Sequence, residues 1–477
     1  MDEKVTYSGS KSNRKSLSLW VVVIVGVLLR WVVSFYGYSG QGNPPMYGDY
    51  EAQRHWMEVT VNLPVKEWYV NTTRNDLLYW GLDYPPFTAY HSLICGYIAI
   101  LLNPAYVQYN VSRGYESPEH KLFMRSTVLI SDLFTYITAA CLYSKAVGSN
   151  FLTVVLLIYP GLILIDHGHF QYNCVSLGLA LLAFIAFLKN KDLVGSLLFC
   201  LAINFKQMLL YYSLPIFFYL LGKTLLLDWK NSVIKLVSLG ATVMITFTLV
   251  WWPFINVAHH VMRRIFPIER GLFEDKVSNM WCLVNVLIKV RNYFGNTQLA
   301  MISALITLST VLPSSLDVFK HPTHRKLVLS LINSSLAFFL FSYQVHEKTI
   351  LLVSLPVMLY YEHEPMLCLW FLEITSLSML PLLIKDNLVI PFISLNIMYI
   401  VILCCFTSSQ KKKSKSFILV IVSAILSWTL FVLSISVSPP SSYPHLYPLL
   451  ISVFCTFHFF GFFIFFNWKQ LVKIKET

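Results

Sequence analysis

Residues 18–36 read SLWVVVIVGVLLRWVVSFY, an apolar run that is interrupted by one charged residue, Arg30. A helix needs about 20 predominantly apolar residues to cross the hydrocarbon core of a bilayer, so this run predicts a transmembrane helix. It lacks a small-residue cleavage site, which argues against a removable signal peptide. Similar runs recur along the chain, and together they decide the fold class.

The apolar runs predict about 14 membrane spans, counted by length and hydropathy. They lie near residues 18–36, 121–143, 150–165, 173–188, 193–205, 207–221, 233–255, 297–314, 327–343, 349–361, 366–384, 388–407, 416–436 and 446–467. Because 56% of the 477 residues are hydrophobic and only 13% are charged, the composition excludes a soluble or a disordered protein. We therefore expect an all-α polytopic membrane protein with one membrane-integral domain, residues 1–477.

The distribution of charge predicts the orientation in the membrane. Lys and Arg collect in cytoplasmic loops, and a cytosolic N-terminus places the net charge of +12 on that side. The tails 1–17 and 468–477 are then cytosolic, and the long loops 37–120 and 256–296 are lumenal. The acidic residues Glu362 and Glu364 are an exception, since they fall where basic residues are expected. No basic stripe with interleaved aromatic residues occurs, so the charge does not indicate a nucleic-acid partner.

The first long loop carries two acceptor sequences for N-glycosylation. These are Asn71-Thr72-Thr73 and Asn110-Val111-Ser112, which supports a lumenal position for the loop. The apolar stretch 88–102 lies between them and is too short to cross a bilayer comfortably. We expect this stretch to lie in the plane of the membrane interface.

Polar chemistry collects at the lumenal side of the predicted spans, where ionisable residues are less costly than in the bilayer. The first loop opens on MYGDYEAQRHW, residues 46–56, and later contains LDYPP, residues 82–86. Aromatic rings that stack on sugars, together with carboxylates that handle hydroxyl protons, suit carbohydrate chemistry. The alternative is an interfacial belt, which also supplies Trp and Tyr.

Two further polar clusters follow. Asp166, His167 and His169 form a group that could bind a metal ion, but three ligands within four residues and no fourth favour a hydrogen-bond network at a helix end. His346 and Lys348 suit a phosphate headgroup near the membrane surface. The alternative for that pair is a loop that only solvates a helix end.

Several segments resemble one enzyme family. They are residues 46–57, 63–69, 79–86 with 88–92, and 270–276. Together they resemble the endoplasmic-reticulum dolichyl-phosphate-glucose α-1,3-glucosyltransferases of N-glycan assembly, which are members of the GT-C superfamily. The resemblance extends from the first predicted span to at least Lys348 and depends mainly on hydropathy after about residue 385.

The resemblance implies a GT-C glycosyltransferase fold in which lumenal loops form the active-site cavity of a single catalytic domain. It implies a multi-pass enzyme of the endoplasmic-reticulum membrane that takes dolichyl-phosphate-glucose from the surrounding lipids. The implied acceptor is Man9GlcNAc2 on dolichyl diphosphate, which receives its first glucose in α-1,3 linkage with inversion. No cofactor and no metal ion are implied, and the sequence has no Gly-rich phosphate loop.

Asp49 lies in the loop that follows the first span, and the resemblance implies that this residue is the catalytic base. One base suffices for an inverting reaction in which the phosphate leaves without a general acid. The alternative acids, which could also bind the acceptor, are Asp83, Glu51 and Asp166. The candidates for binding the phosphate or sugar of the donor are Arg270, His346, Lys348, Arg54 and His55.

Two other functions fit parts of the sequence. The enzyme that adds the second glucose shares the LDYPP element, but it is not expected to carry the run GDYEAQRHW found at residues 48–56. A lipid or sugar transporter would also be polytopic, yet transporters commonly show internal repeats and broken or charged helices at the midplane. The sequence shows no internal repeat, which favours the enzyme.

Overall fold

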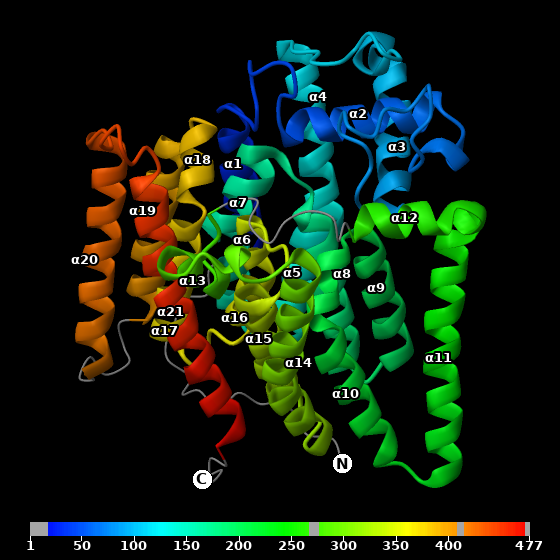
Figure 1. Cartoon of the computed structure of the whole chain (residues 1–477). Coiled ribbons are helices and arrows are strands. Elements are labelled where there is room, and N and C mark those ends of the chain that lie inside the picture. The colour runs from blue at the N-terminus through cyan, green and yellow to red at the C-terminus, as the bar shows by residue number, and fades with distance from the viewer. Residues whose placement is uncertain (1–17, 267–275, 408–414, 473–477) are drawn as a thin grey trace.

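The computed structural model describes residues 18–266, 276–407 and 415–472. Within these ranges the chain forms helices and no strand, which confirms the all-α prediction. Figure 1 shows a tall helical bundle with a smaller cap above one side of it. The two parts correspond to the predicted spans and to the first predicted lumenal loop.

The cap contains α2 (Asp49–Asn62), η1 (Val65–Glu67), α3 (Pro86–Leu102) and η2 (Pro104–Val107). Part of the cap belongs to the core of the bundle, and another part forms a second cluster with Trp68 and Tyr69. These two rings pack against Phe254 with ring centroids 5.8 and 5.5 Å apart. Phe254 belongs to η6 (Trp252–Val257), which continues into α12 (Ala258–Ile265). Figure 1 shows α12 lying across the top of α11 beneath the cap. Burial of these aromatic rings therefore fixes the cap on the bundle.

The bundle is built from the remaining helices. They are α1 (Leu19–Ser34), α4 (Pro118–Asp132), η3 (Leu133–Ile137), α5 (Thr138–Val147), α6 (Asn150–Leu157), α7 (Pro160–Ile163), η4 (Leu164–Phe170), α8 (Asn173–Leu188), α9 (Asp192–Phe205), η5 (Gln207–Tyr212), α10 (Ser213–Leu225), α11 (Trp229–Trp251), α13 (Met280–Leu287), η7 (Val290–Asn292), α14 (Asn296–Lys320), α15 (His324–Phe341), η8 (Glu347–Ile350), α16 (Leu351–Leu359), α17 (Pro365–Ser378), α18 (Leu380–Lys385), α19 (Val389–Thr407), α20 (Lys415–Ser436) and α21 (Leu446–Leu471).

Every predicted span overlaps one or more of these helices. Among the described residues, seven helices are long and apolar enough to cross a membrane, or up to eight if the bent pair Asn150–Leu157 and Pro160–Phe170 is one span. Others, such as α1, α8 and α9, are apolar but shorter. The chain is a multi-pass membrane protein, while the count of 14 stays a prediction, as does the division of the chain into one domain with two tails.

A buried ion pair explains the arginine inside the first apolar run. Arg30 Nε lies 2.6 Å from Asp132 Oδ2, and both side chains are fully buried between α1 and α4. His167 Nε2 approaches the same Asp132 oxygen at 2.9 Å. Because a charge inside a membrane protein is tolerated when it is paired, these three residues join α1, α4 and η4. Removing one partner of such a pair typically costs about 3–5 kcal/mol.

The interfacial stretch 88–102 forms α3, which packs on α2 and leaves an apolar face exposed. The exposed residues are Ile94, Tyr97, Ile98, Leu101 and Leu102. An exposed apolar face of this kind suits contact with lipid. The position of α3 in the interface plane stays a prediction.

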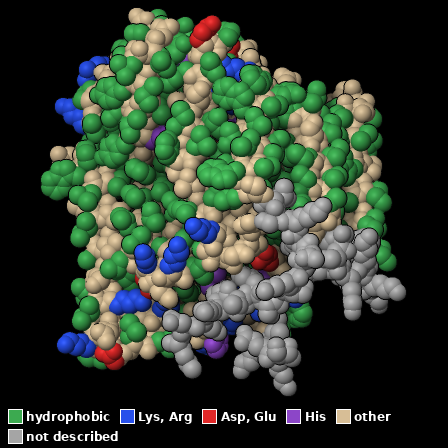
Figure 2. Space-filling model, turned by 180° about the vertical axis from the view of Figure 1, so that it is seen from behind, with side chains coloured by type: hydrophobic (Ala, Val, Ile, Leu, Met, Phe, Trp, Pro, Cys, Tyr) green, Lys and Arg blue, Asp and Glu red, His purple; other side chains and the backbone are tan. Residues whose placement is uncertain are grey.

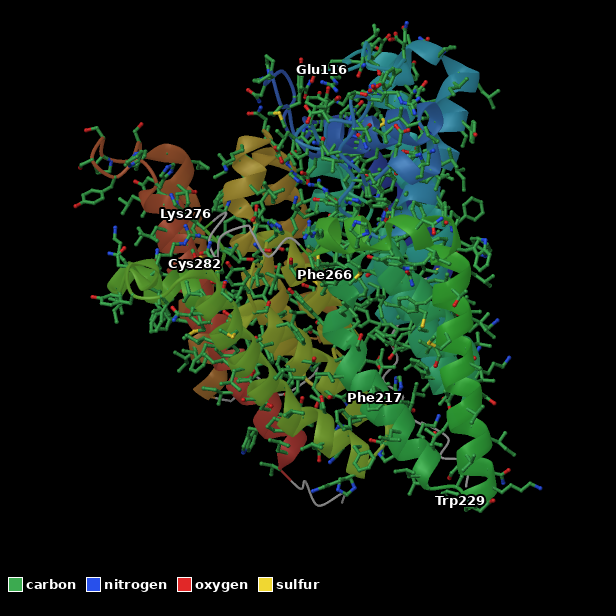
Figure 3. All side chains as sticks on the ribbon, turned by 45° about the vertical axis from the view of Figure 1, so that its right-hand side comes forward. Glu116, Phe217, Trp229, Phe266, Lys276 and Cys282 are labelled. Atoms are coloured by element: carbon green, nitrogen blue, oxygen red, sulfur yellow. The ribbon has the colours of Figure 1, made fainter. Side chains whose placement is uncertain are left out.

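Ion pairs at the end of the bundle away from the cap join segments that are predicted to be cytosolic. Asp192 Oδ1 and Oδ2 bind the ammonium groups of Lys223 and Lys235 at 2.7 and 2.6 Å. Lys469 pairs with Glu364, so the acidic exception in the charge pattern has a basic partner. Figure 3 shows Trp229 at this end and Glu116 in the cap. Figure 2 shows the molecule from behind the view of Figure 1, and hydrophobic side chains cover much of this face.

Candidate active site

A cavity of about 820 Å³ lies between the cap and the upper end of the bundle. Its polar lining comes from the cap, from α8 and η5, and from the segment before α16. The polar and charged side chains are Asp49, Gln53, Asp83, Gln171, Asn173, Lys206, Gln207, Arg264, Ser342, Gln344, His346, Lys348 and Thr349. Aromatic lining residues are Trp56, Trp80, Tyr84, Tyr211, Phe266, Phe338 and Tyr343. Such a lining can bind sugar hydroxyls, a phosphate and an apolar chain.

Asp49 begins α2 and is placed by the turn that precedes it. Its backbone N–H donates to Ser39 Oγ at 3.1 Å, and a carboxylate in the first turn of a helix is favoured by the helix dipole. Gly40 has φ +74°, and a Cβ there would lie 2.1 Å from the backbone nitrogen of Gly48. The close crossing of these two segments therefore requires glycine at Gly40.

One oxygen of Asp49 holds three partners. Oδ2 lies 2.5 Å from Lys348 Nζ, 2.5 Å from Gln171 Nε2 and 3.0 Å from His169 Nε2. Within the described part of the chain Oδ1 makes none of these contacts, so it is the oxygen available to a substrate. Burial alone would raise the pKa of Asp49, but Lys348 and His169 hold it well below its usual range. The carboxylate is therefore ionised at neutral pH.

Two of these partners come from the end of the π-helical turn η4, which contains His169 and is directly followed by Gln171. Phe170 has φ +91°, a left-handed conformation that is rare for a bulky residue and is typical of functional sites. This conformation lets His169 and Gln171, on either side of Phe170, reach the same carboxylate oxygen. The sequence marked this cluster as polar, but it did not predict a contact with Asp49.

Lys206 is a cation of the cavity that the sequence did not identify as a site residue. Its side chain is buried, Nζ lies 2.5 Å from Asn173 Oδ1, and the ammonium sits 5.1 Å from the centre of the Tyr84 ring. Among the described residues no carboxylate lies within ion-pair distance. Burial, with Lys348 nearby, lowers the pKa of Lys206 to about 8. The feature of the sequence that could have identified Lys206 is its position, as a charged residue between two short apolar runs.

Of the alternative acids, Asp83 lines the cavity and Asp166 does not. Asp166 is fully buried behind the wall, where it accepts from Asn173 Nδ2 at 2.7 Å and from the backbone N–H of Cys174 at 2.6 Å. It thus orients Asn173, which in turn binds Lys206. The structure gives Asp166 a supporting position rather than contact with substrate.

Glu51, Arg54 and His55, predicted as contacts for the acceptor or the donor, lie outside the lining of the cavity. Arg54 binds Glu51 and Glu58 at 2.6 and 2.8 Å inside the cap, and Tyr79 Oη donates to Glu51 at 2.8 Å. The reason is helix periodicity, since residues three, four and seven apart share a face. One face of α2 turns to the cavity, and the other carries Glu51, Arg54 and Glu58.

The remaining predicted residues are placed as follows. His346 and Lys348 both line the cavity, and Arg270 lies outside the described residues. Asn71 and Asn110 are exposed on the cap. No group of three or more His, Cys, Asp or Glu in the described ranges is arranged to hold a metal ion.

The chain is similar to known proteins over nearly its whole length. Residues 26–466 match the model of the ALG6, ALG8 glycosyltransferase family. A Mus musculus protein named dolichyl pyrophosphate Man9GlcNAc2 alpha-1,3-glucosyltransferase is 46% identical over 486 residues, covering 94% of this chain and 95% of that protein. The Gallus gallus protein of that name is 44% identical, with the same two shares. An Arabidopsis thaliana protein with that name marked as probable is 39% identical, over 98% and 91% of the two chains. On this match and these identities, the chain belongs to the ALG6, ALG8 glycosyltransferase family.

Proposed function

We propose that the protein transfers glucose from dolichyl-phosphate-glucose, in α-1,3 linkage, onto Man9GlcNAc2 carried by dolichyl diphosphate. The names of the relatives, which match over almost the full chain, support this acceptor and linkage. The observation that carries the mechanism is Asp49, an ionised carboxylate that shares one cavity with Lys348, Lys206 and His346. The base and the groups for a phosphate thus occupy one site.

In the proposed reaction a mannose 3-hydroxyl attacks the anomeric carbon of the donor glucose. Asp49 Oδ1 takes the hydroxyl proton, and the bond between the anomeric carbon and the phosphate oxygen breaks from the opposite face. Lys348, Lys206 and His346 stabilise the charge that develops on the phosphate in this partly enclosed site. Asp83 at the cavity wall is assigned to the acceptor sugar.

The aromatic residues of the cavity suit the sugar parts of the substrates. Trp56 and Trp80 lie on the cap side, where Trp56 Nε1 donates to the carbonyl oxygen of Trp80 at 2.8 Å. Tyr84 lies next to Lys206. Flat rings beside charged groups can stack on pyranose faces while the charges meet hydroxyls and phosphate.

The test uses purified protein, dolichyl-phosphate-glucose and two acceptors, Man9GlcNAc2-diphosphate-dolichol and its monoglucosylated product. We expect glucose transfer to the first acceptor, with at most slow transfer to the second. Transfer only to the monoglucosylated acceptor would assign the protein to the second glucosylation step. No transfer to either acceptor by folded protein would contradict the proposed function.

We also propose that the protein resides in the endoplasmic-reticulum membrane with its cavity in the lumen and both termini in the cytosol. The basic ion-paired segments at the end away from the cap support this orientation. An enzyme that removes N-glycans should increase the gel mobility of the protein, and Asn71→Gln with Asn110→Gln should abolish that change. If treatment with the glycan-removing enzyme leaves the gel mobility unchanged, the prediction of glycosylation is wrong.

A further inference from the structure

A chain of four side chains from four different segments extends from the cavity into the bundle. Lys348 and Asp49 are in contact, and Asp49 Oδ2 lies 3.0 Å from His169 Nε2. The other ring nitrogen, His169 Nδ1, lies 2.5 Å from Asp386 Oδ2. Side chains of His169 and Asp386 are only 2% and 5% exposed, so both sit behind Asp49, away from solvent. Asp386 is in the turn after α18 and was not singled out from the sequence.

The surroundings fix the imidazole in this position. The backbone carbonyl of His169 accepts from Ser39 N–H at 3.0 Å, and Arg125 Nη2 donates to the carbonyl of Gly168 at 2.7 Å. The backbone of Asp386 packs closely against Gly37, just after α1. A Cβ on Gly37 would lie 2.5 Å from the Asp386 carbonyl oxygen. The backbone of His169 is therefore held in place, and the ring is held by its own contacts with Asp386 and Asp49.

Proton counting restricts what His169 can do. An ionised carboxylate only accepts, so Nδ1 must carry a hydrogen that it donates to Asp386. Nε2 then has either a lone pair or a hydrogen, and it can serve only one partner at a time. With a lone pair it accepts from Lys348, whose Nζ is 3.2 Å away. With a hydrogen it donates to Asp49.

The basicity of Asp49 raises a problem that this geometry can solve. After burial is taken into account, the Lys348 ammonium, the largest of the lowering causes, holds the pKa of Asp49 well below its usual range, whichever form His169 is in. A carboxylic acid of that strength does not retain a proton at neutral pH. The proton taken from the acceptor hydroxyl needs a second acceptor, and Nε2 of His169 is in contact with Asp49.

We propose that His169, held by Asp386, is a positioning residue that orients Asp49 and receives the proton Asp49 takes from the acceptor. This inference depends on the proposed role of Asp49. The O–H bond of the acceptor breaks as its oxygen bonds to the anomeric carbon, and the bond to phosphate breaks with its electron pair left on the phosphate. The carboxyl group then turns so that its protonated oxygen faces the imidazole, the proton passes to Nε2, and Asp49 is again ionised. His169 gains one positive charge while the phosphate gains one negative charge.

Lys348 completes this exchange. Once Nε2 carries a hydrogen it no longer accepts from Lys348, and the ammonium is released toward the phosphate, which has just gained charge. Among the described residues the charged groups that face His169 are Asp49 on α2, Asp386 after α18 and Lys348 in η8. Arg125 on α4 contacts the neighbouring carbonyl of Gly168, and the cavity lysine Lys206 lies farther off. Of these groups, Asp386 favours a protonated ring from the side away from the substrate.

The test is the pH dependence of glucose transfer by the Asp386→Asn enzyme. It is measured with the purified full-length protein and both substrates, over a range of roughly pH 5 to 9. Removing this carboxylate makes the protonated imidazole less stable. We expect kcat at neutral pH to fall about tenfold and the acid limb of the kcat/KM profile to move to lower pH by about one unit. A purely structural residue would lower the rate and leave the acid limb where it is.

Two further variants complete the design. His169→Gln keeps a polar group near Nε2 but does not titrate in this range, so it should lose the acid limb and at least tenfold in rate. Asp192→Asn is the matched control, since it removes a buried ion-paired carboxylate at the other end of the bundle and should leave the profile unchanged.

The outcomes separate this inference from the proposed function. If Asp49→Asn is inactive but Asp386→Asn keeps the wild-type acid limb, the proposed relay, which is proton transfer from Asp49 to His169, is overturned. The role of Asp49 as the base is then supported. If His169→Gln transfers glucose within twofold of wild type, the relay is overturned as well. Should Asp386→Asn fail to fold, as judged by size-exclusion chromatography, the His169→Gln profile decides alone. Normal turnover by Asp49→Asn would contradict the proposed function itself.

Discussion

An Asp49→Asn enzyme is expected to transfer glucose about 10²-fold more slowly than wild type, or worse, while still binding dolichyl-phosphate-glucose. Asparagine keeps the size of the side chain and its contact with Gln171, but it cannot take a proton. The structure predicts this effect because Asp49 is the acid at the start of α2 that lines the cavity and pairs with Lys348. The measurement is single-turnover transfer with saturating donor.

Asp83→Asn is the comparison for this experiment, since Asp83 also lines the cavity and is the alternative acid. The Asp83→Asn enzyme is expected to retain a larger share of the transfer rate than Asp49→Asn. It should weaken binding of the acceptor more than binding of the donor. If Asp49→Asn turns over normally and Asp83→Asn is inactive, the two roles are reversed.

Replacing Lys348 by methionine is expected to reduce turnover by about 10²-fold, the usual scale for removing one group that stabilises developing negative charge. It should also change the pH profile. Burial raises the pKa of Asp49, and Lys348 is the main cause that lowers it. Without the ammonium, both Asp49 and the imidazole of His169 hold a proton at higher pH, so the acid limb of kcat/KM should move upward. This direction is opposite to that expected for Asp386→Asn.

Lys223→Met is a suitable control, because it removes an ion-paired lysine at the far end of the bundle. It should leave both the rate and the pH profile unchanged. Lys348→Arg should recover part of the lost rate, since it restores the charge in a different shape. Unchanged kinetics of Lys348→Met would mean that the donor phosphate is bound elsewhere, for example by Lys206 and His346.

The sequence by itself determined the class of fold. Runs of apolar residues long enough for a bilayer leave helices as the available structure for this chain, because an exposed backbone polar group in hydrocarbon is too costly. The same runs located nearly all helices of the bundle to within a few residues. Asp49 was the base predicted from the sequence, on its place in the loop after the first span and on the family resemblance, and this role stays a prediction.

The tertiary structure decided which polar residues meet. Glu51, Arg54 and His55 are as close to Asp49 in sequence as any candidate, yet the turn of α2 directs Glu51 and Arg54 into a separate ion-paired network in the cap. Lys348 and His169 are 299 and 120 residues away from Asp49 along the chain, and both contact it in the folded protein. Asp386, from the turn after α18, contacts His169 in turn. Hydropathy sets where each helix begins and ends, but it carries no information on which helices are neighbours. The partners of Asp49 are therefore a property of helix packing, which depends on side-chain fit between segments far apart in the chain.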